Sequence, residues 1–333
     1  MRKHFLIPAL ILCVLGCSQK PVDPAAGAPN FPLNVERFDS AFFEMDTLHT
    51  TASLNSLQSH FPNFTTDFIT KVLMINTLQD TQLIKTYLRT YMPIYKEAKK
   101  LNAIKIAQPF LEDGFKHFHF YFPNYNLPHK LILFVGPLGI YGNIITKDAI
   151  AVGLQMYLGA SSSWYQTESL QTIYPTYKNS RLEPSNMVVT AIENLIEDLP
   201  RIKESDNLMN NMIEAGKKQY LLKACLPNFQ DSVLFDYTNK QLKVLNKEES
   251  KIWDYIVADK MIYTTNTSDM MAFMQESTSN EIFGEDFPGN IGKYIGFKIV
   301  DIWMRQKAQS NITMEQLLAT PAHQIFSSAN YNP

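Results

Sequence analysis

The stretch MVVTAIENLIEDLP (residues 187–200) has the spacing of an amphipathic helix. Its apolar residues at positions 188, 192, 195, 196 and 199 recur every three or four residues, so they fall on one helix face. The same periodicity predicts that helices make up most of the chain. The other predicted helices span 79–101, 206–226, 239–259, 267–277, 289–308 and 313–326, and Pro93 is expected to kink or interrupt the first of them.

Three segments in the first half of the chain are typical of strands. FKHFHFYF (115–122) alternates apolar and polar residues, whereas 129–143 is a buried apolar run that Gly-Pro ends. The segment 148–159 is apolar, with glycine at its turns. The sequence shows no internal repeat and no dividing linker, so we predict one helix-rich α+β domain with a small β-sheet in its first half.

The N-terminal sequence MRKHFLIPALILCVLGC (1–17) has a basic start, an apolar run and small residues before a cysteine. It predicts a signal peptide (1–16) that is too short to remain as a membrane-spanning helix. The residues Val-Leu-Gly before Cys17 fit a bacterial lipoprotein, so we expect Cys17 to be acylated and inserted in a lipid bilayer. Residues 17–33, rich in Pro, Ala and Gly, are interpreted as the lipid anchor and tether of a domain at 34–333. This domain would face the periplasm, from either the inner or the outer membrane.

The charge balance argues against nucleic acid as a partner. The chain has 30 Lys and Arg against 32 Asp and Glu, and no basic stripe is visible. Of its cysteines, Cys13 lies in the signal peptide and Cys17 is the predicted lipid site. Cys225 is therefore alone in the mature chain and is interpreted as a packing residue.

At the centre of the helix predicted at 187–200, the residues IENLI (192–196) can be aligned with the zinc-binding motif H-E-x-x-H. Ile192 and Ile196 stand at the two histidine positions and have no lone pair to give to a metal. Glu193 stands where a general base would be, and Glu214, about 20 residues downstream, could take the place of a third ligand on the following helix. Glu193 and Glu214 are thus vestigial candidates, and we predict no catalytic residue, metal or cofactor.

A second set of possible metal ligands is His117 and His119, which would point to the same side of a strand at 115–122. With Glu214 as a third ligand they would allow an active zinc peptidase. The interpretation we favour is an amphipathic strand in which the histidines form the polar face and Phe118 and Phe120 fill the core.

The helix predicted at 289–308 contains Gly292 and Gly296 in a G-x-x-x-G pattern. Its charged residues Lys293, Lys298, Asp301 and Arg305 argue against a membrane-spanning role. The glycines are therefore expected to let this helix approach another helix closely in the core, with Pro288 and Asn290 as its start signals.

Several blocks of the chain, in this order behind the lipoprotein signal, resemble the GldB family of gliding-motility lipoproteins. They run from VERFDSAFF (35–43) through VGPLGIYGN, LMNNMIEAGKKQYLL and FPGNIGKYIGFKIVDIWM to SANYNP. That family is similar in turn to predicted gluzincin-type zinc proteases, in which IENLI aligns with H-E-x-x-H and IEAGKKQY with the helix that carries the downstream glutamate. Gln155, Asn290 and Tyr294 depart from the residues expected in the family.

This resemblance implies a zincin-like protease shell without its zinc motif. The expected function is that of a membrane-anchored, non-catalytic lipoprotein that supports gliding motility and the type IX secretion machinery. Its expected partners are envelope proteins of that machinery. The alternative is an active zinc metallopeptidase that uses a non-standard ligand set, with His117, His119 and Glu214 as candidates.

Overall fold

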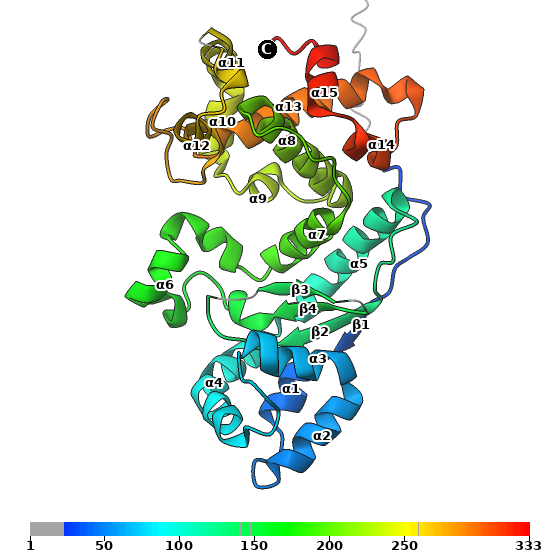
Figure 1. Cartoon of the computed structure of the whole chain (residues 1–333), viewed down its shortest axis with the longest axis vertical. Helices are drawn as coiled ribbons and strands as arrows, with labels where there is room; N and C mark the ends of the chain where they lie inside the picture. The colour runs from blue at the N-terminus through cyan, green and yellow to red at the C-terminus, as the bar shows by residue number, and fades with distance from the viewer. Residues whose placement is uncertain (1–22, 140–141, 147, 259) are drawn as a thin grey trace, which may run out of the picture.

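The computed structural model describes residues 23–139, 142–146, 148–258 and 260–333. The signal peptide predicted at 1–16 and the predicted lipid site Cys17 lie outside the described residues. Helices dominate the described chain, and a four-stranded sheet lies in its first half (Figure 1). The predicted α+β class is therefore confirmed.

The sheet has the strand order β1-β2-β4-β3. Strands β1, β2 and β4 are parallel, and β3 is antiparallel to β4. The central strands read KLILF and IAVG and are almost entirely buried, as expected for a parallel sheet covered on both faces. The strands predicted at 129–143 and 148–159 are confirmed but are shorter than expected, and β1 was not predicted. The four strands are β1 (Asn34–Glu36), β2 (Lys130–Phe134), β3 (Asn143–Ile145) and β4 (Ile150–Gly153).

Along the sequence, some helices precede strand β2 and the others follow strand β4. Those before β2 are α1 (Phe38–Phe43), α2 (Thr50–His60), α3 (Pro62–Asp67), α4 (Thr81–Leu101) and α5 (Ala103–Tyr121). Those after β4 are α6 (Glu168–Ile173), α7 (Asn186–Asp198), α8 (Leu208–Cys225), α9 (Asp231–Phe235), α10 (Asn239–Lys247), α11 (Glu249–Ala258), α12 (Thr267–Met274), α13 (Ile291–Gln306), α14 (Met314–Ala319) and α15 (Ala322–Ala329). Each of the segments predicted at 239–259 and 313–326 thus forms two helices, and α4 continues through Pro93.

The prediction of a strand at 115–122 is wrong, because residues 115–121 form the C-terminal end of helix α5 and Phe122 is its C-cap. The buried residues Leu111, Phe115 and Phe118 are spaced three and four apart, which is the period of a helix. Phe118 is buried as expected, but Phe120 is exposed. The helical period of the whole segment therefore outweighs the short alternation of aromatic residues.

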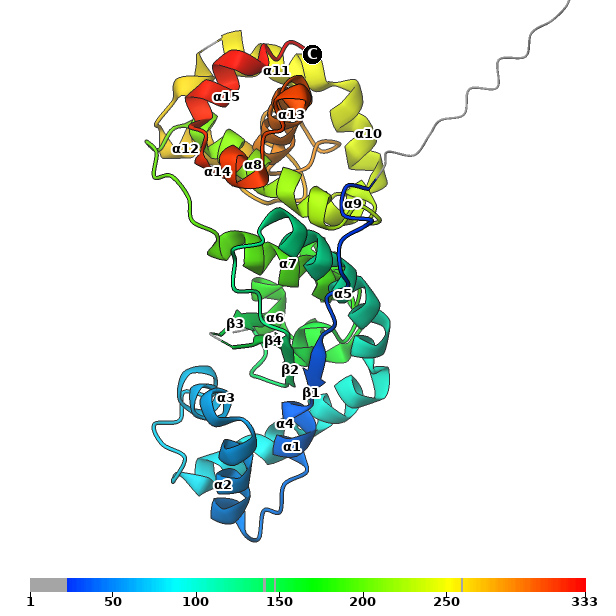
Figure 2. The ribbon, with the colours of Figure 1, turned by 90° about the vertical axis from the view of Figure 1, so that its right-hand side faces the viewer.

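The residues before β1 pack against the domain rather than form a free tether. Ala25, Phe31 and Leu33 are buried, and the Leu33 backbone N–H donates to Glu112 on α5 at 3.1 Å. Figure 2 shows this segment, in dark blue, running beside α5. The part of the predicted tether that the structure describes, residues 23–33, thus belongs to the folded body.

Helix α8 joins two hydrophobic cores. Its C-terminal residues Leu221 and Leu222 belong to the core around the sheet, together with α1 to α5 and α7. Its N-terminal residues Leu208 and Met212 belong to a second core, to which α9 to α15 also contribute. The two cores lie one above the other in Figures 1 and 2, so the molecule is elongated along the line that joins them.

Glycines allow α8 and α13 to cross in direct backbone contact. A Cβ atom at Gly296 would lie 1.7 Å from the carbonyl oxygen of Met212, and one at Gly216 would lie 2.2 Å from the carbonyl carbon of Gly296. Both distances are far below van der Waals contact, so neither position can hold a larger residue without moving a helix. The predicted close approach of the helix at 289–308 to another helix is confirmed.

Candidate functional site

The apolar face of α7 is part of the first core. Ile192 and Ile196 are 0% and 2% exposed. A Cβ at Gly114 of α5 would lie 3.1 Å from Ile192 Cδ1, so this isoleucine is packed directly against α5. The two positions that would carry histidines in H-E-x-x-H are thus filled by core side chains with no donor atom for a metal.

Glu193 lies on a different side of α7 from the two isoleucines. Among the described residues no hydrogen-bond or ion-pair partner of its carboxyl group is found. Burial raises the pKa of Glu193, because the charged form loses its hydration, while the charges of Arg181 and Lys293 oppose this shift. Glu193 is therefore a desolvated carboxyl group held near two cations.

The charged groups that act on Glu193 line a cavity of about 620 Å³. The cavity lies between the two cores, and its wall comes from segments far apart in the sequence. The N-terminal ends of α7, α10 and α13 border it, and helix N-termini carry a partial positive charge. Its lining includes Arg181, Glu183, Asn186, Phe235, Asp236, Tyr237, Thr238, Glu276, Ser277, Asn290 and Lys293.

Arg181 bridges two carboxylates across this cavity. Its Nε donates to Asp236 Oδ2 at 2.8 Å and its Nη2 donates to Glu276 Oε1 at 2.6 Å. Burial disfavours the charged form of Glu276, but the positive charges of Arg181 and Lys178 hold its pKa below the usual value. The three segments that carry Arg181, Asp236 and Glu276 are thereby tied together by charge-assisted bonds.

Lys293 projects from the first turn of α13 into the same cavity. Its Nζ donates to the carbonyl oxygen of Phe235 at 2.7 Å and lies 5.1 Å from the ring centroid of Tyr237. Burial lowers the pKa of Lys293, and the negative charge of Glu193 works against that shift. At the helix cap, buried Asn290 Oδ1 has no hydrogen-bond partner in the described part of the chain.

Glu214 is not among the residues that line this cavity. Its carboxylate accepts from Lys217 Nζ at 2.5 Å, and the same ammonium donates to the carbonyl oxygen of Thr320 at 2.7 Å. The Lys217 side chain is only 1% exposed, so Glu214 provides the counter-charge for a buried cation. The two vestigial candidates, Glu193 and Glu214, therefore have separate roles in this structure.

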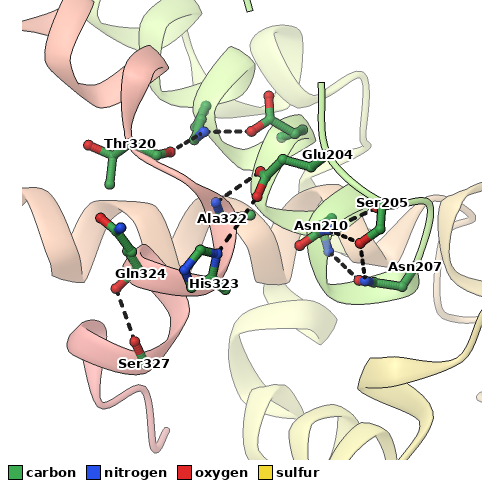
Figure 3. Close-up of polar contacts among 11 residues, drawn as sticks. Glu204, Ser205, Asn207, Asn210, Thr320, Ala322, His323, Gln324 and Ser327 are labelled. Carbon is green, nitrogen blue, oxygen red and sulfur yellow. Dashed lines mark hydrogen bonds and ion pairs between the residues drawn. The ribbon is translucent and has the colours of Figure 1, made fainter. Parts of the chain in front are cut away.

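Further polar contacts lie near the start of α8, where the connection from α7 meets the C-terminal helices (Figure 3). Glu204, in the connection between α7 and α8, accepts from the Ala322 backbone N–H at 2.9 Å and lies 3.9 Å from His323 Nδ1. Asn207 caps α8 by accepting from the Asn210 N–H at 2.9 Å. The Glu204 contacts thus hold the start of α15 against the connection before α8, and the Asn207 contact caps α8 itself.

The structure does not bring the alternative ligand set together. On helix α5 the side chains of His117 and His119 lie about 160° apart around the helix axis instead of on one side. His117 is buried and contacts the Asp113 carbonyl oxygen at 2.8 Å, whereas His119 is exposed beside Phe31. No group of three His, Cys, Asp or Glu side chains arranged to hold a metal ion is found among the described residues.

The remaining residues singled out in the sequence are structural. Cys225 is fully buried, and burial raises the pKa of its thiol, which agrees with a packing role. Gln155 is buried and accepts from the Gly136 N–H at 2.8 Å. Tyr294 belongs to the second core and its hydroxyl donates to Asn246 at 2.9 Å.

Sequence reasoning missed the residues that line the charged cavity, because they are scattered between positions 180 and 293. One signal was present: Lys293 is a cation in the first turn of a helix that is otherwise apolar on its buried side. Such a position is unfavourable for a lysine unless the folded chain supplies partners.

Within the described residues, no helix combines the length and apolar character that crossing a bilayer requires. The fold and the site define a helix-rich α+β protein in which Ile192 and Ile196 of α7 are buried in the core. A sequence profile described as gliding motility protein GldB matches residues 19–333. The chain therefore belongs to the GldB family of gliding-motility lipoproteins. No curated protein and no solved structure matches it significantly.

Proposed function

We propose that this protein is a membrane-anchored, non-catalytic lipoprotein that supports gliding motility and type IX secretion from the periplasmic side of the cell envelope. It is held in the membrane through acylated Cys17, and it retains a zincin-like shell whose former active-site helix is α7. The proposed partners are envelope proteins of the motility and secretion machinery.

The observation that carries the proposal is the burial of Ile192 and Ile196 in the core. A zinc peptidase needs nitrogen, oxygen or sulfur ligands at these positions, and an isoleucine that fills the core cannot move aside to admit another ligand. Glu214 is engaged with buried Lys217 and does not complete a metal site. Each of the three former ligand positions thus has a structural role.

The charged cavity supports a scaffolding role for the same region. Arg181, Asp236 and Glu276 join η4 (Thr176–Leu182) to the segments after α9 and α12, so their bonds hold parts of the two cores together. The three side chains are 38%, 20% and 34% exposed, so their bonds are expected to fix the arrangement of these segments more than to add stability. In this proposal Glu193 belongs to that charge network and does no proton transfer.

The experiment is complementation of a strain that lacks the gene. A Glu193→Gln variant keeps the shape of the side chain and removes its ability to act as a base. We expect it to restore colony spreading and surface secretion to the wild-type level, as Glu197→Gln on the exposed side of the same helix would. Loss of both functions at a normal protein level for Glu193→Gln alone would contradict the non-catalytic proposal. Normal spreading and secretion in the deletion strain would contradict the proposed role itself.

A further inference from the structure

Helix α5 exposes three large apolar side chains on one face. Ile106, Phe110 and Phe120 are 66%, 48% and 43% exposed. At 100° per residue, these three positions lie within an arc of about 80° around the helix axis. Single exposed apolar residues are common on proteins, but an aligned set on one helix marks an interaction surface.

The N-terminal segment, which begins at Asp23 and follows the predicted lipid site Cys17 in sequence, contacts this same face of α5. Asp23 Oδ1 lies 3.0 Å from His117 Nε2, and His117 lies on the α5 face between Phe110 and Phe120. Figure 2 shows the N-terminal segment beside α5. Only six peptide steps separate Cys17 from Asp23, and a fully extended chain of that length spans roughly 20 Å.

The surroundings of this face suit a phospholipid surface. A groove of about 400 Å³ lies between the N-terminal segment and α5, and its wall is mostly proline, glycine, alanine and Phe120. Lys116 borders the groove and Lys105 is exposed beside Ile106, so two ammonium groups are available for lipid phosphates. The carboxylates of Asp23 and Asp113 both contact His117, at 3.0 and 3.7 Å.

We propose that this face of α5, defined by Ile106, Phe110, Phe120, Lys105 and Lys116, is a membrane-docking surface that lies on the bilayer into which Cys17 is inserted. The inference rests on the proposed lipid anchor. The short link brings the face within reach of the lipid headgroups, and the apolar side chains enter the boundary between headgroups and acyl chains. The acyl anchor and the docking surface together fix the orientation of the body on the membrane, whereas an anchor alone would leave it free to rotate.

The test uses the full-length acylated protein reconstituted in vesicles of phosphatidylethanolamine and phosphatidylglycerol. The vesicles contain a small fraction of phospholipid with a photoactivatable group on its acyl chain. After illumination, mass spectrometry locates the lipid adducts on the chain. We expect the adducts to concentrate in peptides from 105–123 and to spare the peptides that contain Leu48 and Met74, which are 87% and 67% exposed.

A triple variant, Ile106→Ser with Phe110→Ser and Phe120→Ser, should lower the adduct yield at 105–123 roughly tenfold while the protein still sediments with the vesicles. The control with Leu48→Ser and Met74→Ser should leave that yield unchanged. Thermal unfolding of each variant checks that it is folded.

Adducts spread evenly over the surface, or gathered in another segment, would overturn the docking surface and leave the anchor intact, because the wild-type protein would still sediment. A wild-type protein that does not sediment with vesicles would overturn the anchor and, with it, the docking surface. Adduct mapping on the wild type decides between these outcomes without relying on any variant.

Discussion

The crossing of α8 and α13 gives a stringent test of how the two cores are joined, through the substitution Gly296→Ala. The added Cβ would lie 1.7 Å from the Met212 carbonyl oxygen and 2.5 Å from its carbonyl carbon. Both are backbone atoms inside α8, so no side-chain rotation can relieve the contact. The two helices must therefore separate, and the packing around the crossing must loosen.

The magnitude follows from two opposing effects. Overpacking a core costs about 1–3 kcal/mol, and a collision with backbone belongs at the upper end of that range or beyond it. Alanine in place of glycine inside a helix returns about 1 kcal/mol through helix propensity. We expect Gly296→Ala to lower the free energy of unfolding by about 2 kcal/mol or more.

The assay is urea-induced unfolding followed by circular dichroism, with Gly114→Ala as the matched control. Gly114 is also inside a helix, but the nearest atoms to its added Cβ belong to side chains, at 2.9 Å from Leu226 Cδ2 and 3.1 Å from Ile192 Cδ1. Its cost should therefore be clearly smaller. A Gly296→Ala protein as stable as the wild type would refute the close crossing, and with it the joint between the cores.

Three further changes test individual contacts by unfolding measurements. Glu214→Ala leaves the buried Lys217 ammonium without its counter-charge and should cost about 3 kcal/mol. Ile192→Ala removes a core side chain that is 0% exposed and should also cost about 3 kcal/mol. Glu193→Gln should stabilise the protein at about pH 8 and not at about pH 4, because burial raises the pKa of Glu193 in the folded state. At pH values between the pKa of Glu193 in the unfolded state and its raised pKa in the folded state, the folded wild-type protein binds more protons than the unfolded one. The stability of the wild-type protein therefore falls as pH rises through this range.

Each of these changes has its own control. The double variant Glu214→Ala with Lys217→Met should regain most of the lost stability, and no recovery would show that the pair is not coupled. Ile106→Ala, on the exposed face of α5, should cost far less than Ile192→Ala, and equal costs would contradict the burial of Ile192. A Glu193→Gln effect that is the same at both pH values would show that the Glu193 carboxyl is not desolvated.

The sequence predicted the helices that have a long and consistent apolar period. α7, α8 and α13 were expected within a few residues of their observed bounds, because each places apolar residues every three or four positions over several turns. The role of the glycines in α13 was also predictable, since a glycine pair one turn apart has few other uses in a charged helix.

Two kinds of feature could not be predicted from local pattern. The aromatic residues of 115–122 fit the period of a strand as well as that of a helix. The helix is favoured only when the apolar spacing that starts at Leu111 and the preceding turns is included. Strand β1 has three residues and owes its existence to pairing with β2, which lies almost a hundred positions away. The spacing of apolar residues indicates local periodicity, but it does not predict pairing between strands that are so far apart in the sequence.

The candidate site shows the same division. That Ile192 and Ile196 offer no ligand to a metal was visible in IENLI, because isoleucine has no lone pair whatever the fold. The cavity was not visible, since Arg181 meets Asp236 and Glu276 across 55 and 95 positions of sequence. Charged residues so far apart become a site only through tertiary structure.

The most direct test of the central claim is the zinc content of the full-length protein, purified without chelator and without an affinity metal and measured by inductively coupled plasma mass spectrometry. The proposal of a protease frame without a metal site predicts no zinc above the background of a matched blank. About one zinc ion per chain would mean that other ligands have replaced Ile192 and Ile196, and it would contradict the non-catalytic function.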